Sequence, residues 1–438
     1  MPSYVGFVAG APVVLASLLI VFSPTVLAEA RSPGGEGAMS ILTSEARLPR
    51  PDLTLAEAIE RAMTSNPALA AQRRELAARQ GERVQAGLLP NPSLSVLLED
   101  TRSATRTTTV QIDQRIELGG KRSARVDVAD GRVNTADADL AARTLEVRSE
   151  VTAAFYAVLA GQERVALTDE LLVLAGRALQ AASKRVAAGK SAPLEASRAK
   201  IAEASARMEQ NQAQSALAVQ RRRLAATWAG LDDGFGRVAG EIMTGAVAMA
   251  WPQLLSRLEQ APQMLSARHA LERSQSTVAL ERAKRTPDLT VSLGNIRSEE
   301  IGRNQALIGL SIDIPLFDRN QGNIIDATQR AGMAADEMGA LRAKLQVDLF
   351  EAHQQLQVAQ QSAMTLKADV VPAALSAFRA AVIGFELGKF SFLDVLDAQR
   401  SLSLARSRYI ETLTEISRAA TQIERVLGPL DSATLSAD

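Results

Sequence analysis

The sequence predicts a mostly α-helical chain with a small β part, built from two copies of one unit. The same landmarks recur in the same order along the chain. Pro67 corresponds to Pro262 at an offset of 195 residues, and a Gly-Lys turn at Gly189 corresponds to one at Gly388 at an offset of 199. Each unit is far longer than a solenoid repeat, so the pattern indicates a duplicated half-molecule. The second copy's four extra residues are expected in the loop joining its two strands.

Composition excludes several classes of protein. The 438 residues include 49 basic and 49 acidic side chains, so no charge bias points to nucleic acid as a partner. No cysteine is present, which excludes disulfides, thiolate metal sites and a lipid-modified N-terminal cysteine. His269 and His353 lie far apart and by themselves make no metal centre. We therefore expect no cofactor, no bound metal and no enzyme activity. Aromatic residues are only 3%, which favours helices packed through small side chains.

The N-terminus is typical of an exported protein. Residues 4–28 carry no charge, and an apolar segment from Val13 to Phe22 precedes small residues at Ala28 and Ala30. This pattern predicts a signal peptide cleaved after Ala28 or Ala30, although no Lys or Arg precedes the apolar core. An uncleaved membrane helix is the alternative. No other segment is expected to be long and apolar enough to cross a membrane as a helix.

The remaining boundaries follow from turn residues and from the period of the apolar positions. The predicted organisation is a signal peptide at 1–28, an extended arm at 29–52, a first repeat at 53–230 with strands about 93–113 and a helical hairpin about 125–229, a linker at 231–250, a second repeat at 251–428 with strands about 288–314 and a helical hairpin about 320–427, and a tail at 429–438.

Two helices are too long for a compact globule. Residues 125–187 contain no proline, and the matching run 324–387 is interrupted only by Pro372. About 60 residues at about 1.5 Å each make a rod of order 90 Å. The returning helices, 193–229 and 391–427, are expected to run antiparallel to these rods. Such lengths favour a coiled coil or bundle, so a soluble coiled-coil scaffold is one alternative.

Four segments alternate between apolar and polar residues, as strands with two different faces do. In residues 289–294 Leu, Val and Leu alternate with Thr, Ser and Gly, and three other segments follow the same rule. An apolar outer face and a polar inner face are typical of transmembrane β-strands. Four strands do not close a barrel, and an open edge is not tolerated in lipid. Pooling strands from three chains would give twelve, an even number in the known range.

Several motifs together resemble the TolC-type outer-membrane efflux family over nearly the whole exported length. They are Leu53–Ile59 followed by Asn66 and Pro67, then Gly87–Ser93, and finally Leu387–Gln399. Within that family, Glu117–Arg122 and Ile314–Asn320 resemble the CzcC-like branch, which serves heavy-metal cation efflux.

The resemblance implies a homotrimeric channel in the outer membrane of a Gram-negative bacterium, continued by an α-helical barrel through the periplasm. It implies contacts with outer-membrane lipid, a periplasmic adaptor protein and an inner-membrane RND-type, proton-driven pump. The chain would conduct substrate passively. Heavy-metal cations are the cargo that the branch implies, with drugs or secreted polypeptides as alternatives.

Two aspartates constrict the periplasmic entrance in this family, and they match Asp394 and Asp397. A ring of carboxylates brought together by symmetry would attract cations. The alternative is that both are solvated or helix-capping carboxylates. The first copy differs, with Glu195 and Arg198 at the equivalent positions, and Arg198 is a candidate partner for an aspartate that holds the entrance shut.

Two further sets of residues have expected geometric roles. The turns Gly189-Lys190 and Gly388-Lys389 form the hairpin tips, where glycine permits the left-handed conformation that ends a helix. Their exposed positions also make them candidate contacts for the adaptor. Gly119, Gly120 and Pro315 are expected at the junctions between strand and helix.

Overall fold

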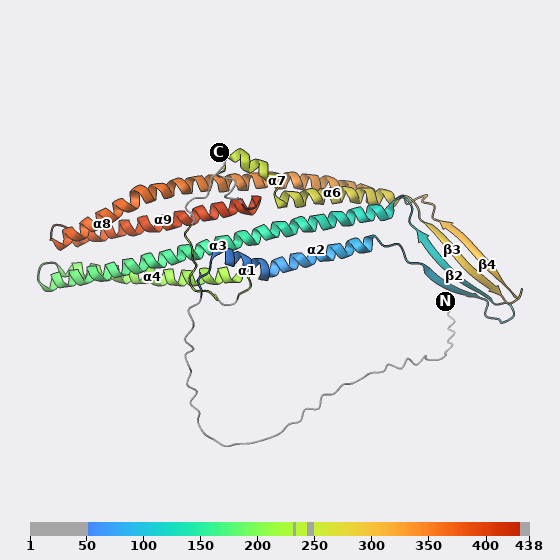
Figure 1. Ribbon diagram of the computed structural model, residues 1–438, viewed down its shortest axis with the longest axis horizontal. Coiled ribbons are helices and arrows are strands. Elements are labelled where there is room, and N and C mark those ends of the chain that lie inside the picture. The colour runs from blue at the N-terminus through green and yellow to red at the C-terminus, as the bar shows by residue number, and fades with distance from the viewer. Residues whose placement is uncertain (1–50, 231–233, 243–248, 430–438) are drawn as a thin grey trace, which may run out of the picture. The chain divides into compact units, whose positions relative to one another are not determined.

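The computed structural model describes residues 51–230, 234–242 and 249–429, which belong to one compact unit. The order of its elements repeats (Figure 1). The first copy contains α1 (Leu55–Ser65), α2 (Pro67–Ala86), β1 (Ser93–Glu99), β2 (Thr107–Ile116), α3 (Lys121–Ala187) and α4 (Pro193–Ala226). The second contains α5 (Trp251–Leu258), α6 (Pro262–Ala283), β3 (Leu289–Ser298), β4 (Arg303–Ile312), α7 (Gln321–Thr365), η1 (Leu366–Val370), α8 (Val371–Glu386) and α9 (Phe392–Leu427).

The two long helices form as predicted. Helix α3 has 67 residues, and in the second copy α7, η1 and α8 follow one another without a break. The element η1 is a short π-helix that ends two residues before Pro372, which stands in the first turn of α8. Proline lacks the N–H that an α-helix would use and crowds the preceding turn, so a local change of helical winding accommodates it.

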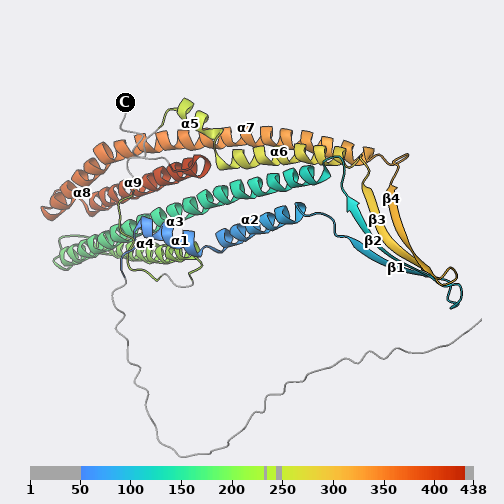
Figure 2. The same ribbon diagram turned by 45° about the vertical axis from the view of Figure 1, so that its right-hand side comes forward.

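The helices lie side by side in two overlapping rows. Next to the strands the row is α2, α3, α6 and α7, and towards the hairpin tips it is α4, α3, α9 and α8 (Figures 1 and 2). The central apolar cluster includes Val151, Phe155, Leu349 and Ile416, each almost fully buried. A second cluster lies near the tips and includes Phe378, Phe385 and Phe392. A third cluster, around Met264 and Leu345, joins α5 and α6 to α7 and α9, so three separate cores hold the described helices together.

The four strands form one antiparallel sheet in the order β1-β2-β3-β4. The pairing places apolar side chains on one face: Leu94, Val96, Val110, Ile112, Val291, Leu293, Ile308 and Leu310. Ile308 is 78% exposed and Leu310 73%, so this face packs against nothing in the described chain. The outer edges of β1 and β4 are also unpaired within the described chain. Both observations are expected of strands that face lipid and pair with another chain.

The predicted position of the four extra residues was wrong. The loop between the strands is shorter in the second copy, 299–302 against 100–106 in the first. The difference lies instead between the last strand and the long helix, where 117–120 in the first copy correspond to 313–320 in the second. Sequence offsets count extra residues between two landmarks, but they do not say which connection holds them.

Part of the predicted linker packs into the core. Phe235 and Val238 are almost fully buried, and Val238 forms an isolated parallel β-bridge with Leu53. The side-chain amide of Gln162 on α3 donates to the Val238 carbonyl at 3.0 Å and accepts from its N–H at 2.9 Å. The predicted signal peptide and nearly all of the extended arm and the C-terminal tail lie outside the described residues.

One helical stretch, Gln321–Glu386, is long and apolar enough to cross a membrane by length and composition alone. The expectation that no segment beyond the N-terminus would meet this test was therefore wrong. Of its most apolar window, 22% is buried, so much of that apolar surface faces away from the chain's own core.

Candidate functional site

The two hairpin tips share one turn geometry. Gly189 and Gly388 have φ angles of 69° and 75°, the left-handed conformation in which a helix commonly ends. The N–H of Lys190 donates to the Arg185 carbonyl and that of Lys389 to the Gly384 carbonyl, both at 2.8 Å. These bonds satisfy carbonyls at the helix ends and leave both lysine side chains exposed.

Asp394 caps its own helix. Its Oδ2 accepts from the Ser391 N–H at 2.7 Å and from the Ser391 hydroxyl at 2.8 Å, and its N–H completes a capping box with that hydroxyl. Hydrogen bonds from the Ser391 side chain and then its backbone lower the pKa of the Asp394 carboxyl below its ordinary value. Within a single chain, Asp394 is therefore a helix-capping carboxylate, which was one of the alternatives for this residue.

The cap at Asp394 is expected to weaken in acid. The pKa of the Asp394 carboxyl is lower in the folded chain than in the unfolded chain. The stabilisation that the cap gives to the helix is therefore fully present at pH values above the ordinary aspartate pKa, and it is lost as the pH falls through the lowered pKa of the folded chain. Hydrogen exchange of the Ser391 amide, corrected for its intrinsic rate, should report faster opening in that range. Asp394→Asn should remove this pH dependence. An unchanged pH dependence in Asp394→Asn would contradict the assignment.

The other residues expected at the periplasmic entrance, Asp397, Glu195 and Arg198, are not paired with one another in the described chain. Asp397 is exposed, and no ion pair joins it to Arg198. Arg198 lines a groove between α4 and α9 together with Gln399 and Arg400. Glu195 lacks the cap of its counterpart because Ala192 stands where the second copy has Ser391, and its Oε2 is buried without a hydrogen-bond partner. The tips of the two copies are therefore chemically different.

Sequence reasoning missed the residue that joins the two tips. Arg185 on α3 donates from NH1 to the Phe385 carbonyl at 2.6 Å and from Nε to the Ser191 hydroxyl at 3.2 Å. Its guanidinium also lies 4.6 Å from the centroid of the Phe385 ring. The 200 positions between Arg185 and Phe385 hide this contact from any local pattern. The internal repeat carries one clue, because Arg185 aligns with Gly384 rather than with a second arginine.

Removing this contact is expected to loosen the second tip. Arg185→Met keeps most of the side-chain length but loses the donors and the charge. The opening free energy of the turn at Lys389 should fall by about 1–3 kcal/mol, the usual value of a charged hydrogen bond with a cation–π contact. Hydrogen exchange at the Lys389 amide measures it. Lys184→Met, a change at an exposed neighbour, is the matched control and should have little effect.

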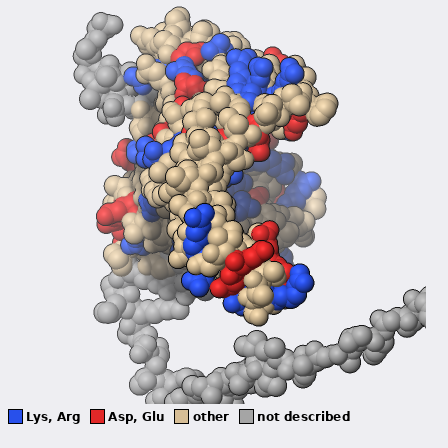
Figure 3. Space-filling model, turned by 90° about the vertical axis from the view of Figure 1, so that its right-hand side faces the viewer, with Lys and Arg blue, Asp and Glu red and all other residues tan. Residues whose placement is uncertain are grey.

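The strand end has a different character. The polar face of the sheet carries Gln111 and Asp113 on β2, and the Ser292 hydroxyl on β3 donates to Asp113 Oδ1. In the view onto this end, a broad uncharged surface lies between groups of charged side chains (Figure 3). One face suited to lipid and one suited to water thus occur on the same four strands.

The residues expected at the junctions lie there. Gly119 and Gly120 have φ angles of 71° and 73°, and Gly120 is the residue before α3. Next to them, Lys121 Nζ lies 2.6 Å from Asp288 Oδ1, which the sequence did not suggest as a site residue. Pro315 lies in the longer second junction and is exposed. The first junction ties β2 and α3 to the start of β3.

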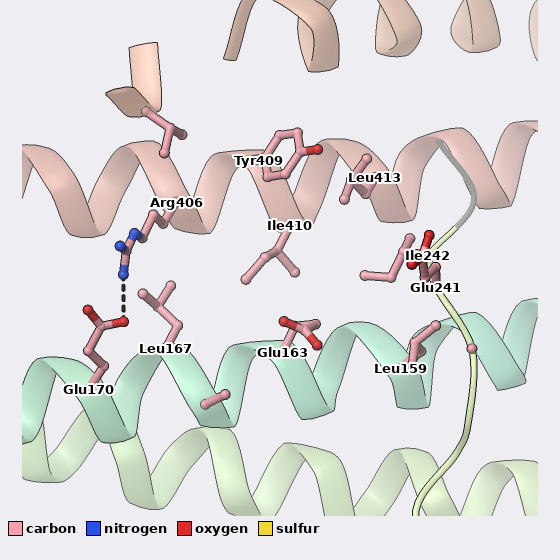
Figure 4. Close-up of a pocket in the computed structure, with 13 residues that line it drawn as sticks. Leu159, Glu163, Leu167, Glu170, Glu241, Ile242, Arg406, Tyr409, Ile410 and Leu413 are labelled. Carbon is pink, nitrogen blue, oxygen red and sulfur yellow. Dashed lines mark hydrogen bonds and ion pairs between the residues drawn. The ribbon is translucent and has the colours of Figure 1, made fainter. Parts of the chain in front are cut away.

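A cavity of about 520 Å³ lies between α3 and α9 (Figure 4). Apolar side chains such as Leu167 and Ile410 line it, and an ion pair of 2.6 Å between Glu170 and Arg406 crosses one end. No group of three or more His, Cys, Asp or Glu side chains suited to a metal ion occurs in the described part of the chain. The described chain thus offers long surfaces and an open sheet rather than an enclosed reaction site.

A sheet with one apolar, exposed face lies at one end of two long helical hairpins. This arrangement defines the class of protein as a TolC-type outer-membrane channel. The family model for outer membrane efflux proteins matches residues 58–230 and 254–429. The chain is 43% identical to the cobalt-zinc-cadmium resistance protein CzcC of Cupriavidus metallidurans, over 94% of this chain and 98% of that protein. It is 27% identical to the nickel and cobalt resistance protein CnrC of the same organism, over 66% and 70%.

Solved structures agree on the fold. The outer membrane protein VceC of Vibrio cholerae superposes with a TM-score of 0.72 at 20% identity, over 85% of this chain and 96% of that one. The chain belongs to the outer membrane efflux protein family. The predicted resemblance, the duplicated helical and β fold and the outer-membrane location are thereby confirmed. The family forms channels rather than catalytic sites.

Proposed function

We propose that three copies of this chain form one continuous duct that carries heavy-metal cations across the outer membrane. The observation that carries the proposal is the pair of open edges: β1 and β4 end the sheet, and α2 and α7 end the row of helices beside it. A sheet with open edges does not survive in lipid, so another copy must cover them. Three copies supply twelve strands, an even number within the range of known barrels.

Apolar side chains on the outer helices support this assembly. On α4, Leu194, Ile201 and Met208 are spaced by seven residues, and each is more than half exposed. On α7, Ile325, Val347 and Val358 are also more than half exposed. Apolar residues at heptad spacing are what a helix offers to a neighbouring helix in a coiled coil. The opposite end of each row also exposes an apolar side chain, Ile383 on α8 (57%) for the row of α4 and Val84 on α2 (65%) for the row of α7. Both ends of each row thus carry apolar surface that a neighbouring copy can cover, as closure into a ring requires.

The cargo is inferred from the relatives. CzcC is named for resistance to cobalt, zinc and cadmium, and its likeness covers nearly the whole of both chains. A periplasmic adaptor and an inner-membrane RND-type pump would deliver the ions and supply the energy. The exposed Lys190 and Lys389 at the tips are candidate adaptor contacts, and Asp394 and Asp397 are candidate members of a carboxylate ring at the entrance.

Growth of a deletion strain tests the cargo. We expect loss of resistance to cobalt, zinc and cadmium, restored by the intact gene, with little change against a panel of drugs. Copper and silver should be included as other metals. Sensitivity to drugs alone would overturn the assignment. Membrane fractionation is the companion measurement, because release without detergent would favour a soluble coiled-coil scaffold.

A further inference from the structure

The two junctions between strand and helix differ in chemistry as well as in length. The first, 117–120, reads Glu-Leu-Gly-Gly, and the second, 313–320, reads Asp-Ile-Pro-Leu-Phe-Asp-Arg-Asn. The extra residues expose apolar side chains, with Leu316 63% and Phe317 91% exposed. Phe317 is the most exposed large apolar side chain of the described residues. Ile314 in the same junction is 74% exposed, and a contiguous run of exposed apolar residues, unlike a single one, marks a contact surface.

The second junction is held in one conformation by hydrogen bonds. Asn320 Nδ2 donates to the Glu281 carbonyl at 2.8 Å and to its Oε2 at 2.7 Å. The Asn320 N–H donates to Asp318 Oδ1, and the Arg319 N–H to Gln321 Oε1, both at 2.8 Å. These hydrogen bonds fix the backbone of the loop, and they therefore fix the position of Phe317.

The first junction shows what such a connection packs against. Because β2 and β3 are antiparallel, the end of β2 lies beside the start of β3. Gly119 therefore lies against Thr286, and both Lys121 Nζ and the Leu118 N–H bond to Asp288 Oδ1, at 2.6 and 3.3 Å. The partner of a junction is thus the segment that leads into the next strand.

On its inner side the second junction borders residues 284–288 of its own chain, with which it lines one pocket. On its outer side it has no such partner within the described residues, because β4 ends the sheet. Antiparallel pairing of β4 with β1 of another copy would place the end of β4 beside the start of β1. The partner of 313–320 is then the segment 87–92 of that copy. In the described chain Leu88 and Leu89 of this segment are 52% and 67% exposed.

Comparison of the two copies shows that the residue types differ both in the junction and in the segment that leads into the neighbouring strand. At the offset of 195, Leu89 stands where Lys284 stands in the second copy, and Ser93 where Asp288 stands. At the helix start Gln321 replaces Lys121, so the ion pair of the first junction has no counterpart. Arg122 and Arg125 bond to the Gly87 and Leu88 carbonyls at 2.7 and 3.1 Å. These bonds hold the backbone and leave both leucine side chains exposed.

We propose that Leu316 and Phe317 of one copy pack against Leu88 and Leu89 of the next, and so lock the ring where sheet and helices meet. The occupant of this surface is a second copy of the chain. The proposal rests on the trimer proposed above and names one contact within it. An apolar contact between chains replaces the ion pair that joins the equivalent segments within a chain.

Disulfide cross-linking tests the contact cleanly because the chain has no cysteine of its own. Phe317→Cys combined with Leu89→Cys should, on oxidation in membranes, give dimer and trimer bands that a reductant reverses. Leu316→Cys with Leu88→Cys is a second pair that allows for an imperfect bond geometry. The matched control is Ile301→Cys with Leu89→Cys, since Ile301 is 59% exposed but lies in the loop at the far end of the strands. The control and each single variant should give no such bands beyond trace.

The mass of the same variants in detergent separates the two ideas. Trimers that cross-link through neither pair would overturn the contact and leave the trimer standing. Monomers in detergent that cross-link through neither pair in membranes would overturn both. If Phe317→Cys reacts with a water-soluble maleimide in detergent-extracted trimers but not in membranes, lipid covers the residue, and the proposal is wrong.

Discussion

Gly119→Ala is expected to destabilise the folded chain by about 2–5 kcal/mol, the largest effect of a single methyl group that we expect here. Two costs add at this position. The φ angle of 71° disfavours any side chain, and an added Cβ would stand 2.5 Å from Cβ of Thr286. That neighbour is fixed to the backbone that enters β3, so relief requires movement of the junction. Equilibrium unfolding in urea, with the protein in lipid vesicles, measures the loss.

Gly120→Ala is the matched control for this change. Gly120 has nearly the same φ angle, 73°, but an added Cβ would meet nothing within 4 Å. Only the conformational cost remains, about 1–2 kcal/mol. Adding Thr286→Gly to Gly119→Ala removes the contacting atoms and should recover part of the difference. Equal losses for the two glycines would contradict the close approach at Gly119.

Charge reversal at Asp397 is expected to change the ion preference of the channel. In a trimer three copies of this exposed carboxylate would surround the entrance. At about 10 Å from the axis and in water, each contributes about 0.4 kcal/mol to the energy of a monovalent cation. The ring then favours cations by roughly eightfold, and Asp397→Lys should reverse this preference. Reversal potentials in planar bilayers under a salt gradient measure it, and high salt should weaken the effect.

Asp394 needs a separate comparison because it also caps α9. Asp394→Asn removes the charge, whereas Ser391→Ala removes the capping partner and keeps the charge. If the charge governs conduction, the first variant should alter ion preference and the second should not. Unchanged preference in both Asp397→Lys and Asp394→Asn would rule out the carboxylate ring.

The cap at Asp394 was within reach of the sequence, whereas Arg185 was not. A serine three residues before an acidic residue at a helix start is a capping signature, and Ser391 and Asp394 have this spacing. The contact of Arg185 with Phe385 depends on how two hairpins pack, and nothing local to either residue encodes it. The shift of the extra residues from the strand loop to the second junction has a similar origin. Both connections tolerate insertion, so only the observed pairing distinguishes them.

Sequence by itself determined the duplication, the long helices, the turns and the strands with two faces, because each depends on the spacing and type of nearby residues. Tertiary structure decided which edges stay open, where the second junction exposes Phe317, and that Asp397 and Arg198 do not pair within one chain. The physical reason is that these features depend on which segments distant in sequence pack together, and neither Asn320 with Glu281 nor Arg198 with Asp397 is local in sequence. Local patterns predict which faces of helices and strands are apolar, and tertiary packing decides which of these faces are buried within the chain.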